Sequence, residues 1–500
     1  EKVRSILRYF YLKTKSSLTY FFTIYSGGDL HFSKWFLLDP FNLLKGSYMI
    51  SFLKSNPGKP VPDAEIRDRY NRLRWNALFG IFIGYAAFYI LRNNFLLSSP
   101  ELISDFGFNK KDIGFISGTM LILYGLSKGF MSAIADKSNP KHFMIFGLMM
   151  SAAVNLMMGF SASFWAFLLL CVLNGIFQGM GAGPAYIVLA SWFPRKSRGV
   201  TTAIFNISHN VGGGLVAPIA GASIAWLGQE HWQAAHFVVP VAIATIIAII
   251  FYIFGAGRTY NEGLPPVGKI LENEQDELVV TKEENVNLST WEIFRDYILK
   301  DINVWFVSFI DVFTYMIRFG VLTWLPLYLL ETKGFSKAQM GTAFAIFEWA
   351  AIPSTLLAGW LTDTYFKGRR MPLAIITLFG VGTAMFVYWG GTDLLTVTIG
   401  AGIIGCLIYV PMFLSSLQTI ELVPSFAAGS ATGLRGLLSY ILGSFSGTAL
   451  FGILADKFGW DAGFYLLLFA VAGCIFCCYM THLGVLRLER KKAQAATNQQ

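Results

Sequence analysis

Apolar residues recur along this chain in runs of about 20, separated by short polar connectors. A helix of that length crosses the roughly 30 Å hydrocarbon layer of a bilayer, because each helical residue adds about 1.5 Å. We expect spans over residues 75–98, 112–135, 141–160, 164–190, 199–226, 236–256, 303–329, 340–361, 371–391, 394–418, 427–452 and 461–485. The pattern therefore predicts an all-α membrane protein with twelve transmembrane helices.

One connector is much longer and more polar than the others, and it divides the spans six and six. We expect an N-terminal cytoplasmic segment, a six-helix bundle, a linker loop, a second six-helix bundle and a tail, over 1–74, 75–256, 257–302, 303–486 and 487–500. Residues 1–48 are aromatic and basic, without the apolar stretch of a signal peptide. We expect them to be either an extended reading ahead of a start at Met49 or an amphipathic segment on the membrane surface.

The two halves carry intramembrane arginines at matching places. Arg92 lies in the first span and Arg318 in the seventh. An aspartate, Asp136 or Asp363, ends the following span at nearly the same separation from its arginine. Internal repeats of this kind are typical of secondary transporters whose binding site lies at the membrane midplane between the halves. The sequence therefore predicts two pseudo-symmetric bundles that share a central site.

The composition agrees with a membrane protein, since the 500 residues are 54% hydrophobic and only 14% charged. Lysine and arginine gather on alternate connectors, which by the positive-inside rule places both termini and the long loop in the cytoplasm. Topology therefore accounts for the net charge of +9, and we expect no nucleic-acid partner. All five cysteines lie inside apolar runs, where we expect them to pack as small apolar residues rather than bind a metal.

Cations outnumber acids within the spans, whose polar residues include Arg92, Asn93, Lys128, Asn206, His209, Asp311, Arg318, Glu348 and Arg435. An arginine near the middle of a membrane helix costs on the order of 2.5–3.5 kcal/mol on insertion scales, so something must offset it. The guanidinium stays charged and its planar fork matches two phosphate oxygens. We therefore expect Arg92 and Arg318 to hold one phosphate from both halves. The alternative is a structural pair with Asp311 or Glu348.

Two further polar candidates each have two interpretations. Lys128 either binds the ligand or extends along apolar surface to the membrane interface. His209 is either a core histidine bonded to a helix carbonyl or a donor to phosphate, and we favour the second because imidazole can donate near pH 7.

Seven segments together resemble the organophosphate:phosphate antiporter family of major facilitators: "GYAAFYILRNNF", "YGLSKGFMSAIADKSNP", "NGIFQGMGAGP", "RGVTTAIFNISHNVGGG", "YMIRFGVLTWLP", "FEWAAIPSTLLAGWLTD" and "VPSFAAGSATGLRG". The similarity covers about residues 57–490. It implies exchange of an organic phosphate for inorganic phosphate across a bacterial inner membrane by rocking of two bundles, without a cofactor and as a functional monomer.

The resemblance also implies roles for individual residues. Arg92 and Arg318 would form the phosphate clamp, with Lys128 and His209 nearby. Glu348 would be the charged partner of the second arginine. Four aromatic residues match positions that line the site, Tyr85, Tyr89, Tyr315 and Tyr440, and Asn206 completes the set of candidates.

Departures from the family pattern bear on the substrate. Charged residues typical of glycerol-phosphate or hexose-phosphate members are replaced here by Asn93, Thr323, Ser444 and Gly447. Arg435 is present instead, and aligning the two halves places it one helical turn before the counterpart of His209. An additional cation suits a substrate with a carboxylate, such as phosphoglycerate or phosphoenolpyruvate. The alternative is that Arg435 reaches cytoplasmic headgroups from the end of its helix.

We therefore predict a secondary antiporter that exchanges phosphoglycerate, or phosphoenolpyruvate, for inorganic phosphate by rocker-switch alternating access, in the phosphoglycerate branch of the family. The alternatives are a glycerol-3-phosphate or hexose-6-phosphate antiporter and a non-transporting sugar-phosphate sensor of the same family. A nucleotide-driven pump is disfavoured because the sequence has no G-x-x-x-x-G-K-[ST] loop. An enzyme is disfavoured because no span offers a nucleophile with an adjacent base, or a cluster of metal ligands.

Overall fold

The computed structural model describes residues 51–135, 138–271, 292, 294–366, 368–423 and 427–497. The expectations for residues 1–48, for Asp136 and for most of the long connector lie outside these ranges, as does the side chain of Asp363. Phe52–Gln500 forms one compact unit, and it is described by itself.

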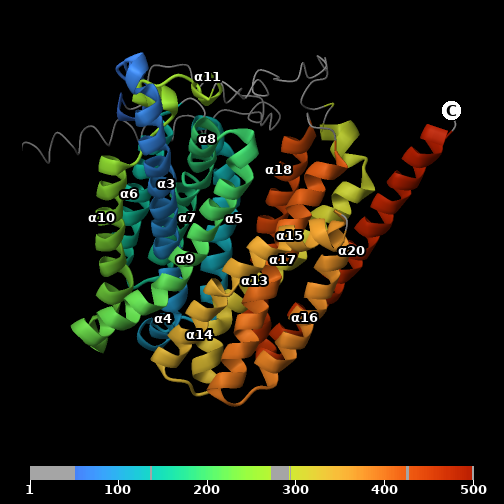
Figure 1. The fold of residues 1–500 in the computed structure, drawn as a ribbon. Coiled ribbons are helices and arrows are strands. Elements are labelled where there is room, and N and C mark those ends of the chain that lie inside the picture. The colour runs from blue at the N-terminus through green and yellow to red at the C-terminus, as the bar shows by residue number, and fades with distance from the viewer. Residues whose placement is uncertain are drawn as a thin grey trace, which may run out of the picture. The chain divides into compact units, whose positions relative to one another are not determined.

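Twelve helices in the described part of the chain are long and apolar enough to cross a membrane (Figure 1). The first half contains α3 (Ile66–Leu97), α4 (Ser99–Phe106), α5 (Lys110–Ala135), α6 (Pro140–Met158), α7 (Phe164–Gln178), α8 (Ala182–Trp192), α9 (Arg195–Leu227) and α10 (Val239–Phe254). The connector contributes the short α11 (Val267–Ile270). The second half contains α13 (Ile302–Glu331), α14 (Lys337–Trp349), α15 (Ala351–Thr364), α16 (Arg370–Gly390), α17 (Leu394–Leu422), α18 (Ala428–Leu438), α19 (Phe451–Phe458) and α20 (Trp460–Thr497). Every predicted span overlaps one of the twelve helices, so the prediction of the fold class is confirmed.

Several helices begin at side chains that satisfy the free N–H groups of the first turn. Asn139 accepts from the backbone N–H of Lys141 just before α6, and Asp393 accepts from that of Thr396 at the start of α17. Ser336 and Gln339 form a capping box at the start of α14. These short polar connectors therefore fix where the apolar helices begin.

Three spans are interrupted near the centre of the molecule. α7 and α8 are separated at Gly179–Gly181, and α14 and α15 at Ala350. Between α18 and α19 the chain forms two π-helical stretches, η9 (Ser439–Ser444) and η10 (Ser446–Leu450). Local π geometry is frequent at functional sites, because it turns side chains out of the regular helical register.

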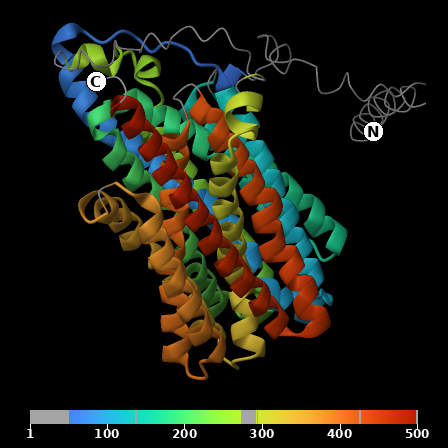
Figure 2. The ribbon, with the colours of Figure 1, turned by 90° about the vertical axis from the view of Figure 1, so that its right-hand side faces the viewer.

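Each half packs its own helices, and several pairs of elements join the halves (Figures 1 and 2). α3 packs on α9 and α10 in the first half, and α13 packs on α20 and η9 in the second. Between the halves, α9 packs against α14, and α5 packs against η9, η10 and α19. Figure 2 shows α20 in red, running along the second half.

A pair of glycine contacts repeats between the halves. A β-carbon at Gly212 of α9 would collide with the carbonyl oxygen of Ala86 in α3, and one at Gly443 of η9 would collide with that of Val312 in α13. Ala86 lies six positions before Arg92, and Val312 lies six positions before Arg318. Close packing therefore sets both arginine-bearing helices against their neighbours in the same way, as the sequence repeat predicts.

Candidate functional site

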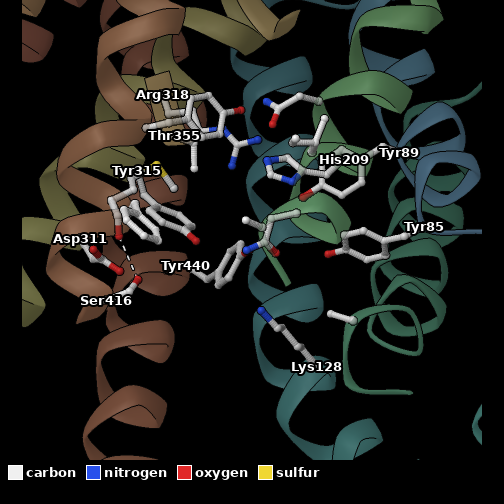
Figure 3. Close-up of a pocket in the computed structure, with 18 of the residues that line it drawn as sticks. Tyr85, Tyr89, Lys128, His209, Asp311, Tyr315, Arg318, Thr355, Ser416 and Tyr440 are labelled. Carbon is white, nitrogen blue, oxygen red and sulfur yellow. Dashed lines mark hydrogen bonds between the residues drawn. The ribbon is translucent and has the colours of Figure 1, made fainter. Parts of the chain in front are cut away.

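A cavity of about 200 Å³ lies between the two halves (Figure 3). Nine of the eleven predicted site residues line it: Tyr85, Tyr89, Lys128, Asn206, His209, Tyr315, Arg318, Arg435 and Tyr440. They come from α3, α5 and α9 in the first half and from α13, α18 and η9 in the second. The helices thus bring together residues that are far apart in the sequence. Arg92 and Glu348 are the two predicted residues that do not line the cavity.

Arg318 reaches from α13 into the cavity, toward His209 and Tyr89 of the other half (Figure 3). Its guanidinium carbon lies 4.7 Å from the centre of the Tyr409 ring. The buried Nε has no hydrogen-bond partner, and no ion pair of Arg318 within 4.0 Å occurs among the residues that the structure describes. Arg318 is therefore a buried cation whose donors are available for a ligand.

Arg92 lies behind the cavity wall. Its guanidinium carbon is 4.3 Å from the ring centre of Tyr89 and 3.9 Å from that of Tyr124, and both rings line the cavity. Nε and one terminal nitrogen donate to Oε1 of Gln178, at 3.2 and 3.1 Å. Neither arginine pairs with Asp311 or Glu348 in the described structure, so the alternative of a structural ion pair does not match the observed geometry.

Lys128 and the cavity aromatics surround the centre. The ammonium group of Lys128 has no hydrogen-bond or ion-pair partner within the described ranges, and Lys128 lines the cavity rather than extending to an interface. The His209 ring lies 5.3 Å from that of Tyr89 and 5.8 Å from that of Tyr409, which belongs to the opposite half. Tyr440 contacts Tyr124 of the first half edge-on, with ring centres 5.1 Å apart. Aromatic contacts therefore connect the halves around the cations.

Arg435 also lines the cavity, but its charge is already paired. A terminal nitrogen donates to Oδ2 of Asp311 at 2.7 Å and to Oγ of Ser416 at 2.8 Å. Ser415 donates to the other carboxylate oxygen of Asp311. Arg435 therefore faces the interior and not the headgroups, and it differs from the expected free cation because Asp311 compensates it. Its buried Nε has no partner.

Glu348, which was expected to be the charged partner of Arg318, has other hydrogen-bond partners. It is fully buried and accepts from Nδ2 of Asn210 and from the hydroxyl of Tyr409, each at 3.2 Å. Because Asn210 belongs to the first half and Tyr409 to the second, this carboxylate connects the halves. It does not form an ion pair with Arg318.

The ion pairs between the halves, among the described residues, lie at one end of the molecule. Glu101 of α4 accepts from Lys337 of α14 at 2.5 Å, and Lys110 of α5 pairs with Glu331 of α13 at 2.8 Å. These contacts lie at the end opposite the basic connectors. The ion pairs of Arg369 and Arg370 near the basic end stay within the second half.

Sequence reasoning missed the polar network behind Arg92. Gln178, Asn174 and Ser151 lie in apolar spans and carry no charge, so they did not stand out as candidates. Their spacing was the available signal. Asn174 and Gln178 are four residues apart, as are Ser151 and Asn155, which puts each pair on one helix face.

A pseudo-symmetric pair of helical bundles around a central, cation-rich cavity is the architecture of a secondary solute transporter. The family model described as "Major Facilitator Superfamily" matches residues 79–448. The chain is 52% identical over 457 residues to the "Phosphoglycerate transporter protein" of Salmonella typhimurium, covering 90% of this chain and 98% of that protein. It is 37% identical to the "Glycerol-3-phosphate transporter" of Bacillus subtilis, covering 83% and 95%.

The chain therefore belongs to the Major Facilitator Superfamily and, within it, to the organophosphate:phosphate antiporter family, which is a family of membrane transport proteins and not of enzymes. A crystal structure of a bacterial homologue of the human lysosomal transporter Spinster, inward-facing and unoccupied, has the same fold. The TM-score is 0.63 with 17% sequence identity, covering 82% of this chain and 94% of that one. This likeness concerns the fold alone.

Proposed function

We infer that this multi-pass membrane protein exchanges phosphoglycerate, or the related phosphoenolpyruvate, for inorganic phosphate. The observation that carries the proposal is a cavity between the halves whose lining contains more cations than acids. Arg318 and Lys128 have no anionic partner among the described residues, and Arg435 is matched by Asp311. A phosphoryl dianion is the ligand that would offset the cost of burying these charges.

The carboxylate of the substrate is assigned to Arg435. Asp311 occupies one terminal nitrogen of this guanidinium, while Nε has no partner. A second anionic group could therefore bind at the remaining donors without first displacing Asp311. The similarity to a phosphoglycerate transporter supports this assignment.

The position of the ion pairs between the halves supports alternating access, because among the described residues they join the halves at one end only. The contacts of Glu101 with Lys337 and of Lys110 with Glu331 close the end opposite the basic connectors. By the positive-inside rule the basic end is cytoplasmic, so the cavity of this conformation would serve the cytoplasm of a bacterial inner membrane, with both termini on that side. Both halves of the site come from one chain, which supports a functional monomer.

The test is phosphate exchange by purified protein in liposomes. Vesicles loaded with phosphate would take up labelled phosphate, and 3-phosphoglycerate, phosphoenolpyruvate, glycerol 3-phosphate and glucose 6-phosphate would compete. We expect the two carboxylated compounds to compete best. Preference for glycerol 3-phosphate or glucose 6-phosphate would favour the other antiporters, and binding without exchange would favour a sensor.

Replacing Arg318 by Lys should nearly abolish exchange while the protein still inserts, because an ammonium cannot form the bidentate contact. The variant is compared with wild type at equal amounts of reconstituted protein. Near-normal exchange by Arg318→Lys would refute the assigned clamp.

A further inference from the structure

The two arginines of the clamp are held differently. Arg318 has no hydrogen-bond partner in the part of the chain that the structure describes, and it lines the cavity. Arg92 makes two hydrogen bonds to one acceptor, Oε1 of Gln178, and lies behind the rings of Tyr89 and Tyr124. The sequence repeat alone would have made the two residues equivalent.

Gln178 is itself fixed by other contacts. It is almost fully buried, and its amide nitrogen donates to the carbonyl oxygen of Phe88 and to Oγ of Ser151, both at 2.9 Å. Both amide hydrogens are therefore used, and the amide oxygen faces Arg92. The opposite orientation would place N–H groups against N–H groups, so the network determines which way the amide points.

The second member of the support lies one turn earlier on α7. Asn174 accepts from Ser151 and donates to the carbonyl oxygen of Leu91, the residue before Arg92. Amides of α7 therefore bond to two backbone carbonyl groups of α3 just before Arg92, those of Phe88 and Leu91. α7 thereby determines the position of Arg92.

The contact with Gln178 uses the donors that phosphate needs. Nε and one terminal nitrogen form one of the two edges through which a guanidinium binds an oxyanion bidentately. In this conformation that edge of Arg92 is occupied by a neutral amide. A ligand in the cavity thus meets the free donors of Arg318 first.

We propose that Gln178 is a positioning residue that withholds Arg92 from the substrate while the cavity is open and releases it as the halves close. The proposal rests on the proposed exchange function. A neutral amide suits this role, because a charge-assisted bond to an amide is weaker than a bidentate pair with phosphate and can be exchanged for it. Arg92 then joins the phosphate only in the closed, occupied carrier, which couples occupancy to the change of conformation.

The decisive variant is Gln178→Glu, because it replaces the amide by a carboxylate of nearly the same shape. The resulting ion pair would hold Arg92 against an incoming phosphate. We expect equilibrium binding of labelled inorganic phosphate to the detergent-solubilised protein to change less than threefold. The maximal exchange rate in liposomes should fall at least 100-fold. A merely structural role would lower binding and exchange together.

A second variant, Gln178→Ala, removes the acceptor and frees Arg92. We expect inorganic phosphate to bind at least threefold more tightly, with slower exchange, because Arg92 would reach the ligand before the halves close. The matched control is Gln418→Glu, which introduces a carboxylate at another buried glutamine that does not line the cavity. It should keep both binding and exchange within threefold of wild type.

Three results would overturn the proposal: exchange by Gln178→Glu above half of the wild-type rate, unchanged or weaker phosphate binding by Gln178→Ala, or an equal loss of exchange in Gln418→Glu. Failure of the wild-type protein to exchange phosphate would instead refute the proposed function. The two failures are therefore distinguishable.

Discussion

A disulfide across the end of the molecule opposite the basic connectors should stop transport. Ala217 of α9 faces Gly341 of α14, and a β-carbon built on Gly341 would lie 3.4 Å from that of Ala217. Disulfide-bonded cysteines have Cβ atoms about 3.5–4.5 Å apart, so a shift of a few tenths of an ångström suffices. Both positions line a second cavity of about 580 Å³, which leaves room for the sulfur atoms. We expect Ala217→Cys/Gly341→Cys to cross-link readily on mild oxidation.

The expected loss of transport follows from the strength of the ion pairs that hold this end closed in the native protein. Side chains of the Glu101–Lys337 pair are 5% and 45% exposed, and those of Lys110–Glu331 are 20% and 37% exposed. Partly exposed pairs contribute about 0.2–1 kcal/mol each, so thermal motion can separate them. A covalent bond cannot be separated in this way.

Exchange of labelled phosphate by the oxidised double variant should therefore fall to the level of protein-free liposomes, and a reductant should restore it. Ala217→Cys and Gly341→Cys alone serve as controls and should exchange under oxidising conditions. Full exchange by protein shown to be cross-linked would mean that α9 and α14 stay together throughout the cycle. That result would refute the proposal that this end of the molecule opens during transport.

Three further variants test other parts of the structure. Lys337→Gln leaves the buried Glu101 without its cation, whereas Glu101→Gln leaves only a half-exposed lysine. We expect Lys337→Gln to favour opening of this end by about 1–2 kcal/mol, which is less than the cost of breaking a fully buried ion pair because Lys337 is half-exposed. Labelling of a cysteine in the second cavity by an impermeant maleimide should then be about tenfold faster, and equal labelling of both variants would contradict the argument. Arg435→Gln should raise the half-saturating concentration of 3-phosphoglycerate more than that of phosphate; an equal effect would remove the carboxylate assignment. Gly212→Ala should lower the thermal unfolding temperature because the new methyl group meets the α3 backbone, with a cost of about 1–3 kcal/mol, while Gly221→Ala, which meets nothing within 4 Å, should not.

The spans were predictable because burial in a bilayer constrains composition strongly, but their ends were not. α3 begins at Ile66 rather than near residue 75, and α20 continues to Thr497. Both extensions are rich in charged residues, several of which are good helix formers in water, so the helices continue beyond the hydrocarbon layer. Hydropathy therefore marks the membrane layer and not the limits of a helix.

The site was predictable only as far as charge reveals it. An arginine within an apolar run is costly, so Arg318 and Arg435 could be found from the sequence alone. Which acid compensates the charge of Arg435 depends on how α13 and α18 are rotated about their axes, and this rotation cannot be predicted from the sequence. Gln178 was missed for a related reason. A neutral amide in an apolar span is common, and only the contact with Arg92 in the structure indicates its role.

The partners of the cations also account for exchange in preference to leak. Moving a carrier between its two open states requires the central side chains to lose water. Asp311 already neutralises Arg435, and Glu348 lies between the halves with Asn210 and Tyr409, so these groups add little to that cost. Of the cations that line the cavity, Arg318 and Lys128 have no anionic partner in the described structure, and a single phosphoryl dianion matches their charge. The empty carrier therefore has the higher barrier, and it returns across the membrane only with a second phosphate.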